Sequence, residues 1–401
     1  MDKIKYKKIL FISGLDIWSM GQQKGAPSLS NTLRGYAEDG WCVFFITGNE
    51  NVKSIDNIHE NVKIYRFDAK WAKLNRYFMK SIWWLYFQIV AFFIGLKVCL
   101  REEIDMFYGY EVTGVPVAKL LSILFHKPFI SRFQGTKTYF HLKDHFWRFR
   151  HWDEVLSMKI KSDLVIMTND GTQGDLMLNI IGKDMSKVKF WMNGVENFLD
   201  VNFNKKEFKK SIGIDPGEKI LLSVSRLEKW KRVDRTIVAV SDIIKNHRQL
   251  KIRLIIIGDG EEKRNLEEMV RNLKIDDYVT FTGALAHAEL KNYYNAADIF
   301  ISLYDISNVG NPLLEAMKCS KCVIALQGGD TDKLIQNDDT GILLKYSELR
   351  ELPSIIIRLL ENSKDMQRLG NKAKIYADKY FWTWQERIRA ELVNVNRLLH
   401  T

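Results

Sequence analysis

Short apolar runs alternate with amphipathic stretches along the whole chain. The apolar runs are rich in Val, Ile and Phe and predict buried strands, whereas stretches with apolar residues three or four apart predict helices. This alternation is typical of parallel α/β sheets. In the first half we expect strands at Ile9–Ser13, Val43–Thr47, Val62–Phe67, Met106–Tyr108, Phe129–Phe133, Leu164–Thr168 and Val188–Met192, and helices at Ser28–Glu38, Tyr77–Leu100, Val112–Leu124 and Phe146–Lys161.

The pattern starts again in the second half. Between the halves, Asp200 to Asp215 is charged and non-periodic, which indicates a linker, and Pro216-Gly217 marks a turn after it. Two domains follow from this restart. The expected strands are Ile220–Val224, Arg253–Ile257, Val279–Thr282, Ile299–Leu303 and Val323–Leu326, and the expected helices are Val233–Asn246, Glu261–Asn272, Glu289–Ala296 and Pro312–Lys318.

Length and composition agree with two globular domains. A chain of 401 residues is too long for one compact core, and its 46% apolar content is enough to fill two. The four cysteines are scattered, which fits a reducing cytoplasm. The N-terminus leads into a short strand without a long apolar signal region, so we expect no secretion signal.

The net charge of +11 calls for an anionic partner. No zinc spacing, helix-turn-helix or RNA-binding signature is visible, so we expect no nucleic acid. Basic residues instead gather among aromatic ones between Lys63 and Arg101, around the apolar run Ile82–Leu96. That run falls short of the roughly 20 residues that cross a bilayer. It predicts a buried helix beside the sheet, an interfacial helix resting on an anionic membrane surface, or both, with one face packed and the other on lipid.

The residues from Ser302 to Ala325 carry the clearest site signal. A strand is followed by a polar loop and then by a helix that opens at Asn311-Pro312, where Asn is expected as the N-cap and Pro at the first helical position. Such a helix start binds anions. Upstream, Arg226 and Lys231 follow another strand. Two cations and a helix N-terminus in one crevice suit a diphosphate.

These motifs resemble glycosyltransferase family 4. Arg226 and Lys231 are similar to its Arg-x4-Lys clamp, and Glu315-Ala316-Met317 to the second half of its E-x7-E motif. The resemblance continues over most of the chain, in Asn193-Gly194-Val195-Glu196, Gly258-Asp259-Gly260 and Phe281-Thr282-Gly283.

The resemblance implies an α/β protein of the GT-B fold, with two Rossmann-like doubly wound domains that face each other across a cleft. It places the acceptor-binding domain at residues 1–198 and the nucleotide-sugar-binding domain at 199–383. A C-terminal helix over 384–401 would cross back to the first domain.

The resemblance also implies roles for single residues. Arg226 and Lys231 would be catalytic, neutralising the diphosphate as it leaves. Glu315 would accept hydrogen bonds from the ribose hydroxyls. Gln134 and Asp305 would face the sugar or the acceptor. The other donor-binding residues would be Ser307, Asn308, Val309, Gly310, Asn311, Leu313, Gly258, Gly260, Leu285, Gly25 and Ala26.

The chain departs from the family pattern at three places. Ser307 stands where the first acid of E-x7-E is expected, which puts the donor sugar in doubt, and Asp305 is a possible substitute. Gln134 stands where many relatives have His, and Gln cannot titrate, so a general base there is not expected. Lys24 precedes Gly25 where relatives usually have another Gly.

No metal or other cofactor is expected. Asp330 and Asp332 have the Asp-x-Asp form of some metal sites but lack further ligands, and Cys319 and Cys322 form a lone pair. The eight histidines show no metal spacing, and His287 is interpreted as a loop or surface residue.

The sequence therefore predicts a retaining, metal-independent glycosyltransferase. Its donor would be a UDP- or GDP-sugar and its acceptor a lipid-linked glycan, at the inner face of the cell membrane. Capsule, O-antigen (lipopolysaccharide) or exopolysaccharide assembly would be the context, by analogy with the family. The alternatives are a catalytically silent nucleotide-sugar-binding partner, and an epimerase or soluble disaccharide synthase of the same fold.

Overall fold

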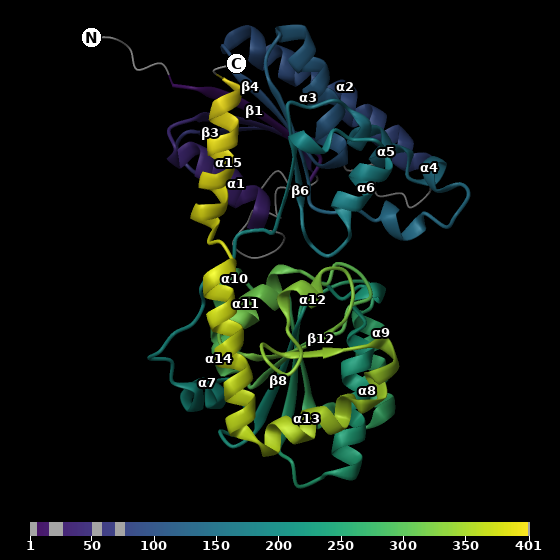
Figure 1. The fold of residues 1–401 in the computed structure, drawn as a ribbon, viewed down its shortest axis with the longest axis vertical. Helices are drawn as coiled ribbons and strands as arrows, with labels where there is room; N and C mark the ends of the chain where they lie inside the picture. The colour runs from purple at the N-terminus through teal and green to yellow at the C-terminus, as the bar shows by residue number, and fades with distance from the viewer. Residues whose placement is uncertain (1–5, 16–26, 50–57, 69–76, 400–401) are drawn as a thin grey trace. The chain divides into compact units, whose positions relative to one another are not determined.

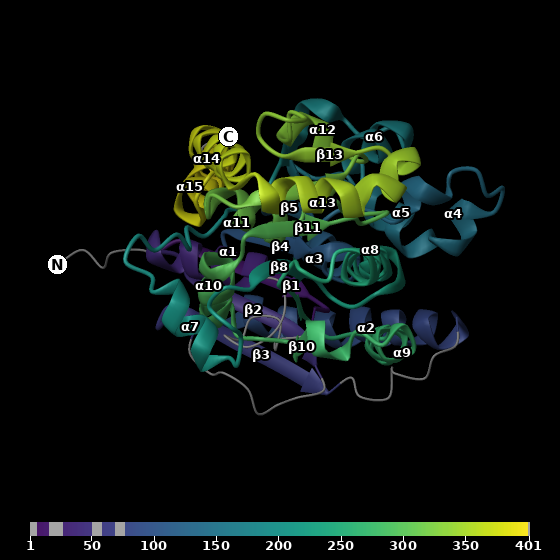
Figure 2. The same cartoon turned by 90° about the horizontal axis from the view of Figure 1, so that it is seen from below.

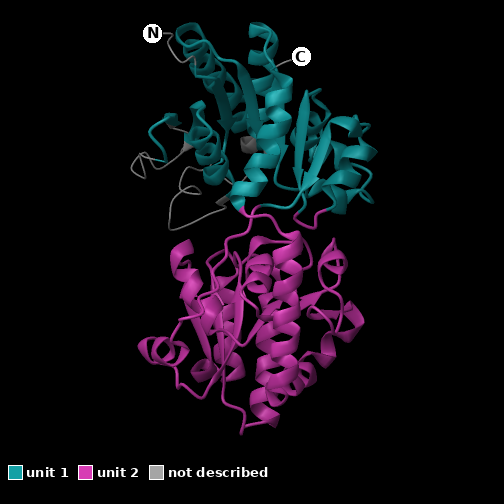
Figure 3. Cartoon of the chain, turned by 60° about the vertical axis from the view of Figure 1, so that its left-hand side comes forward, with its two compact units in different colours: residues 1–169, 173–193, 384–401 teal, residues 170–172, 194–383 magenta. Residues whose placement is uncertain are grey.

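The computed structural model describes residues 6–15, 27–49, 58–68 and 77–399. The chain forms two compact units (Figure 3): unit 1 comprises residues 1–169, 173–193 and 384–401, and unit 2 comprises residues 170–172 and 194–383. The change of unit at residue 194 comes shortly before the predicted boundary at residue 199.

Unit 1 is built on a seven-stranded parallel sheet in the order β3-β2-β1-β4-β5-β6-β7. Its strands are β1 (Lys8–Ser13), β2 (Cys42–Asn49), β3 (Val62–Asp68), β4 (Met106–Tyr110), β5 (Phe129–Phe133), β6 (Leu164–Thr168) and β7 (Val188–Trp191). Its helices are α1 (Pro27–Glu38), α2 (Tyr77–Arg101), α3 (Glu111–Phe125), α4 (Trp147–Arg150), α5 (Trp152–Lys159), α6 (Gly174–Ile180) and α15 (Trp384–Leu398).

Helices cover both faces of this sheet (Figures 1 and 2). On one face, Leu33 of α1 and Ile388 and Leu392 of α15 share a core with the strands. On the other face, Phe87 of α2 and Leu121 of α3 do the same. Strands buried on both faces are continuously apolar, which explains why their positions were predictable. The C-terminal helix thus packs within unit 1, although residues 194–383 belong to unit 2.

Unit 2 has a six-stranded parallel sheet in the order β10-β9-β8-β11-β12-β13. Its strands are β8 (Lys219–Val224), β9 (Ile252–Ile257), β10 (Val279–Gly283), β11 (Ile299–Ser302), β12 (Cys322–Leu326) and β13 (Ile342–Leu344). Its helices are α7 (Lys205–Ser211), α8 (Val233–Asn246), α9 (Lys263–Leu273), α10 (His287–Ala296), α11 (Asn311–Lys318), α12 (Thr331–Leu334), α13 (Leu352–Glu361) and α14 (Ser363–Tyr380). Both units are Rossmann-like α/β domains, which confirms the predicted fold class.

Several elements were not predicted. The predicted linker contains α7, whose start is capped by the Asn204 side chain accepting from the Glu207 amide at 3.1 Å. The short strand β13 and the helices α6, α13 and α14 were also missed. The single helix expected at Phe146–Lys161 is divided into α4 and α5. Of these helices, α7 and α14 start at a side-chain cap, a signal that apolar periodicity does not contain.

Helix α2 is longer than the apolar run that predicted it. The helix extends over 25 residues, and Ser81–Arg101 is long and apolar enough to cross a membrane by length and composition. The core helix of a soluble protein passes the same test, so length and composition alone do not make α2 a membrane span. Only 22% of the most apolar window in α2 is buried. One face of the helix packs beside the sheet through Phe87, Ala91 and Val98, and the other face remains exposed.

Candidate active site

The strand order of unit 2 marks one position where ligands are expected. The chain moves outward from β8 through β9 to β10, then returns to the other side of β8 and continues with β11. In doubly wound sheets, ligands bind beyond the carboxyl ends of the strands at such a switch point. Here the two loops at that point are residues 225–232 after β8 and residues 303–310 after β11.

Lys231 connects these two loops. Its buried ammonium donates to the carbonyl oxygen of Ser307 at 3.3 Å and lies 3.9 Å from the ring centre of Tyr304 and 4.2 Å from that of Trp230. In the described part of the chain, no carboxylate lies within ion-pair distance of this ammonium. Burial lowers the pKa of Lys231 to about 7, although the negative charge of Asp170 opposes the shift. The loops therefore hold a desolvated cation without a counter-ion.

Arg226 belongs to the same loop but is exposed. Its side chain is 68% accessible, pairs with Glu228 at 2.6 Å and has its guanidinium 5.7 Å from the ring centre of Trp230. The loop after β9 lies alongside, because the Leu227 amide donates to the Asp259 carbonyl at 2.9 Å. A side chain at Gly258 or Gly260 would collide with this backbone, which explains both glycines.

The start of α11 differs in detail from the expectation. The helix begins at Asn311, and its N-cap is Gly310, not Asn311. Glu315 consequently lies in the second turn. The Val309 amide donates to the backbone carbonyl of Asp170 at 3.0 Å, so it is engaged within unit 2. Asn308 is buried, and its Oδ1 has no hydrogen-bond donor among the described residues. Leu313 is buried in the helix itself.

Glu315 is buried and held from two sides. The Tyr294 hydroxyl donates to its Oε2 at 2.9 Å, and Nε2 of His287 lies 3.1 Å from its Oε1. Burial lowers the pKa of His287, but the hydrogen bond and charge of Glu315 outweigh this and raise it above its ordinary value. His287 was interpreted as an ordinary loop or surface residue, and no spacing in the sequence links it to Glu315. It is the first residue of α10, two residues after Leu285.

Asp170 is a second residue that the sequence did not single out. The segment Asp170–Thr172 follows β6 in the chain but belongs to unit 2. Its carboxylate accepts from the Ser307 hydroxyl at 3.0 Å. Asp305, the expected substitute for the missing acid, is paired instead with Arg232 at 3.2 Å and Arg235 at 2.6 Å.

Gln134 lies in unit 1, at the end of β5. Its backbone amide donates to Oε1 of Glu111 at 2.6 Å, its side-chain amide donates to the Tyr110 hydroxyl, and its Oε1 accepts from Asn193 at 3.3 Å. The side chain is thus fixed in a polar network. Gly25 and Ala26 lie outside the described residues.

Metal-binding groups are not found at this site. Among the described residues, no three His, Cys, Asp or Glu side chains are grouped so that they could hold a metal ion. Asp330 pairs with Lys333 at 3.0 Å, and burial raises the pKa of both the Cys319 and the Cys322 thiol to about 12.

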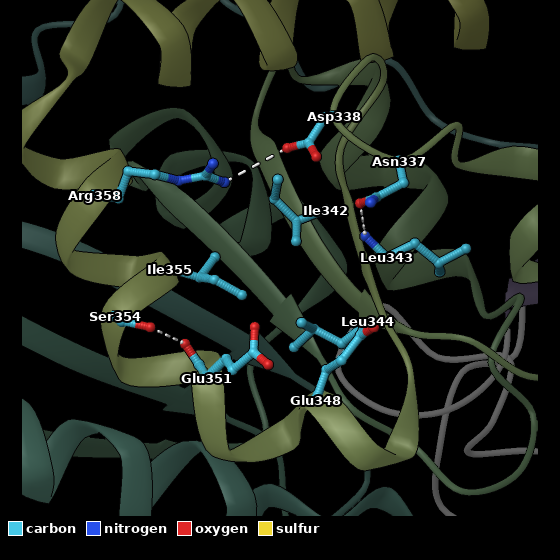
Figure 4. A pocket seen from close by; sticks show the side chains of 10 residues that line it. All are labelled: Asn337, Asp338, Ile342, Leu343, Leu344, Glu348, Glu351, Ser354, Ile355 and Arg358. Carbon is cyan, nitrogen blue, oxygen red and sulfur yellow. Dashed lines mark hydrogen bonds and ion pairs between the residues drawn. The ribbon is translucent and has the colours of Figure 1, made fainter.

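A hollow of about 390 Å³ lies elsewhere in unit 2, between β13 and α13 (Figure 4). Its rim carries the 3.5 Å pair of Arg358 with Asp338, and its floor includes Ile342 and Ile355. None of the predicted site residues lines it. It therefore gives no reason to move the candidate site away from the switch point.

Comparison with known proteins shows which protein family the domain in unit 2 resembles. Residues 204–376 match the family model described as "Glycosyl transferases group 1". Alpha-monoglucosyldiacylglycerol synthase of Streptococcus pneumoniae is 36% identical over 173 residues, which are 43% of this chain and 38% of that protein. An uncharacterized glycosyltransferase of Methanocaldococcus jannaschii is 26% identical over 350 residues, covering 84% of this chain and 85% of the relative.

A solved structure agrees over nearly the whole length. Anabaena HepE in complex with UDP and glucose matches 97% of this chain and 100% of its own with a TM-score of 0.74, at 18% sequence identity. At this identity the likeness shows the fold, which is that of GT-B glycosyltransferases.

Proposed function

From the premise that residues 204–376 form a glycosyltransferase group 1 domain, we propose that the protein is a retaining glycosyltransferase. It transfers a sugar from a UDP- or GDP-sugar to a lipid-linked glycan in the assembly of a surface polysaccharide. The glycolipid synthase among its relatives supports a lipid-linked acceptor, and the UDP-bound structure of similar fold supports a nucleotide-sugar donor.

The observation that carries this proposal is the uncompensated Lys231 at the β8–β11 switch point. A buried ammonium without a carboxylate partner is costly unless an anion completes it. The N-terminus of α11, in the neighbouring loop, adds a partial positive charge. A diphosphate supplies the missing negative charge, and exposed Arg226 closes on it from the solvent side.

The proposed chemistry needs no protein base. The acceptor oxygen bonds to the anomeric carbon on the side from which the diphosphate leaves, and the acceptor proton passes to the departing phosphate oxygen. Arg226 and Lys231 stabilise the negative charge that develops on that leaving group. Gln134 cannot titrate, so its role is to orient a hydroxyl by hydrogen bonding. Glu315, held by His287 and Tyr294, accepts from the ribose hydroxyls, and no metal is required.

A thermal-shift panel of UDP, GDP, ADP and CMP tests the donor site. A ligand at about 100 times its dissociation constant stabilises the protein by roughly 2.7 kcal/mol. We expect one nucleotide to raise the melting temperature, and Arg226→Ala to reduce that shift. Lys229→Ala is the matched control, because Lys229 is exposed in the same loop. A panel without any shift would favour a protein that does not bind nucleotide-sugars.

The exposed face of α2 supports placement on an anionic membrane. Phe87, Ala91 and Val98 pack inward, while an apolar stripe of three- and four-residue spacing remains exposed beside basic Lys97 and Arg101. The stripe consists of Ile82, Leu85, Ile89, Phe93 and Leu100.

Vesicle flotation tests this placement. Ile89→Ser combined with Phe93→Ser should lower binding to phosphatidylglycerol vesicles about tenfold or more, because both side chains lose their transfer into lipid. Val393→Ser, an exposed position on α15, is the control. Equal binding of all variants would remove α2 as the contact surface.

A further inference from the structure

The carboxylate of Asp170 is largely buried beside the candidate diphosphate site. Its Oδ1 accepts from the Thr172 amide at 3.0 Å and from the Thr172 hydroxyl at 2.5 Å, and its Oδ2 accepts from the Ser307 hydroxyl at 3.0 Å. The Asp170 carbonyl accepts from the Val309 amide. Close packing of Gly171 against the backbone of Asn308 and Val309 holds the segment in place. The carboxylate is therefore fixed relative to the loop before α11.

The hydrogen bonds of this carboxylate are incomplete. Each carboxylate oxygen can accept about two hydrogen bonds. Oδ1 has two donors, whereas Oδ2 has only the Ser307 hydroxyl among the described residues. Burial raises the pKa of Asp170, and the hydrogen bonds from Thr172 and Ser307 offset only part of that rise. One acceptor position on Oδ2 thus remains for a further donor.

The neighbouring groups indicate what that donor is. Lys231 donates to the carbonyl of the same Ser307, so the carboxylate adjoins the proposed diphosphate position. A phosphate is not the group that completes Oδ2, because both are negatively charged acceptors and a phosphate supplies no donor. Asn308, one residue on, has a buried Oδ1 that also lacks a donor among the described residues. The open acceptor position on Oδ2 of Asp170 and the unpartnered Oδ1 of Asn308, next to a diphosphate, fit a neutral group that carries several hydroxyls.

We propose that Asp170 binds the hydroxyl groups of the donor sugar and that Ser307 positions its carboxylate. This inference rests on the proposed function, since it assigns the sugar end of the same donor. It also accounts for Ser307 at a position where an acid is expected. The missing carboxylate is supplied from Asp170, one hydrogen bond away, while Asp305 is neutralised by Arg232 and Arg235.

Calorimetric titration of paired ligands tests the assignment. UDP is compared with UDP-glucose, and GDP with GDP-mannose, on the wild type and on Asp170→Asn. A hydrogen bond to a charged group contributes about tenfold to a hundredfold in affinity. We expect Asp170→Asn to weaken the nucleotide-sugar by that factor while leaving the free nucleotide within about threefold. Asp184→Asn is the matched control, because Asp184 accepts from the amide and hydroxyl of Ser186 in an equivalent exposed turn.

A double variant separates sugar binding from a folding effect. Asp170→Asn combined with Ser307→Glu returns a carboxylate to the loop and should recover most of the lost sugar affinity. Equal losses for nucleotide and nucleotide-sugar, or no recovery in the double variant, would overturn the role of Asp170. Neither result would contradict the proposed function. A wild type that binds neither ligand of either pair would overturn the proposed function, and this inference with it.

Discussion

Each unit buries basic side chains, but Arg132 and Arg387 of unit 1 lie beside a carboxylate, whereas Lys231 of unit 2 does not in the described part of the chain. In unit 1, Arg132 and Arg387 are fully buried and share Glu391, whose Oε2 lies 3.0 Å from Arg387 and 3.5 Å from Arg132. The Tyr36 and Tyr108 hydroxyls donate to its Oε1 at 3.0 and 2.8 Å. In unit 2, buried Lys231 has two aromatic rings and a carbonyl as neighbours, but no ion pair in the described part of the chain.

The difference separates a structural cluster from a binding one. The unit 1 cluster joins α15 to β4 and β5, and each of its two guanidiniums has the Glu391 carboxylate of the protein beside it. Such a network fixes where the C-terminal helix packs. Lys231 of unit 2 has no such carboxylate among the described residues, and in the proposed function a ligand supplies the negative charge. If this interpretation is right, removing charge from the two places will change stability with opposite signs.

The largest effect is expected from Glu391→Gln. Without the carboxylate, two buried guanidiniums lose their only shared counter-charge, and removing one partner of a buried ion pair costs about 3–5 kcal/mol. Urea unfolding should show this loss in the unfolding free energy. Glu38→Gln, an exposed acid of the same unit, should leave it unchanged within about 0.5 kcal/mol. A loss below about 1 kcal/mol would mean that the cluster does not hold α15.

Lys231→Met should act in the opposite direction on the empty protein. Replacing a buried, unpaired ammonium by an apolar side chain of similar length is neutral or stabilising, by about 1 kcal/mol. The same variant should lose about tenfold to a hundredfold in nucleotide affinity, because a charge-assisted contact to the diphosphate is removed. Unfolding curves and titrations on one preparation give both values. If Lys231→Met were as destabilised as Glu391→Gln, Lys231 would be a structural residue. The contrast between the Glu391 cluster of unit 1 and Lys231 of unit 2 would then be wrong.

The sequence predicted the fold better than the details of the site. Buried strands such as β5 and β6 were predicted with their observed bounds, because continuous apolar runs depend on burial alone. Helix α2 was placed correctly, but how it packs was left open, since apolar content does not tell which face is buried. The loop and helix around Lys231 and Glu315 were found through motif spacing.

The contacts that complete the site join residues far apart in the chain. Asp170 and Ser307 are separated by 137 positions and His287 and Glu315 by 28, and no local pattern encodes either pair. The burial of Lys231 also depends on Tyr304 from another loop. Asp305 seemed the nearer substitute for the missing acid, yet Arg232 and Arg235 hold it. Only the folded structure shows that Asp305 is paired with arginines, whereas Asp170 keeps an acceptor position open.

The pH dependence of donor binding gives the finest test of the contrast. The pKa of Lys231 is about 7 in the folded protein and near 10.5 in the unfolded chain. Between about pH 7 and pH 10.5, Lys231 binds more protons in the unfolded state than in the folded state. Its contribution to the unfolding free energy therefore rises with pH. Donor binding runs the other way, because a bound diphosphate favours the charged lysine. Affinity should therefore fall above pH 7, by up to about tenfold per pH unit for one linked proton.

A nucleotide-sugar is the right ligand for this measurement, because the terminal phosphate of a free nucleotide itself titrates near pH 6. Titrations at pH 6, 7 and 8 should give a steady affinity below pH 7 and a decline above it. Lys231→Met should bind weakly at every pH and show no decline, even though Asp170, Arg226 and Glu228 remain around the site. If the variant keeps the decline, another group titrates there, and Lys231 is no longer the charge that distinguishes unit 2 from the carboxylate-paired arginines of unit 1.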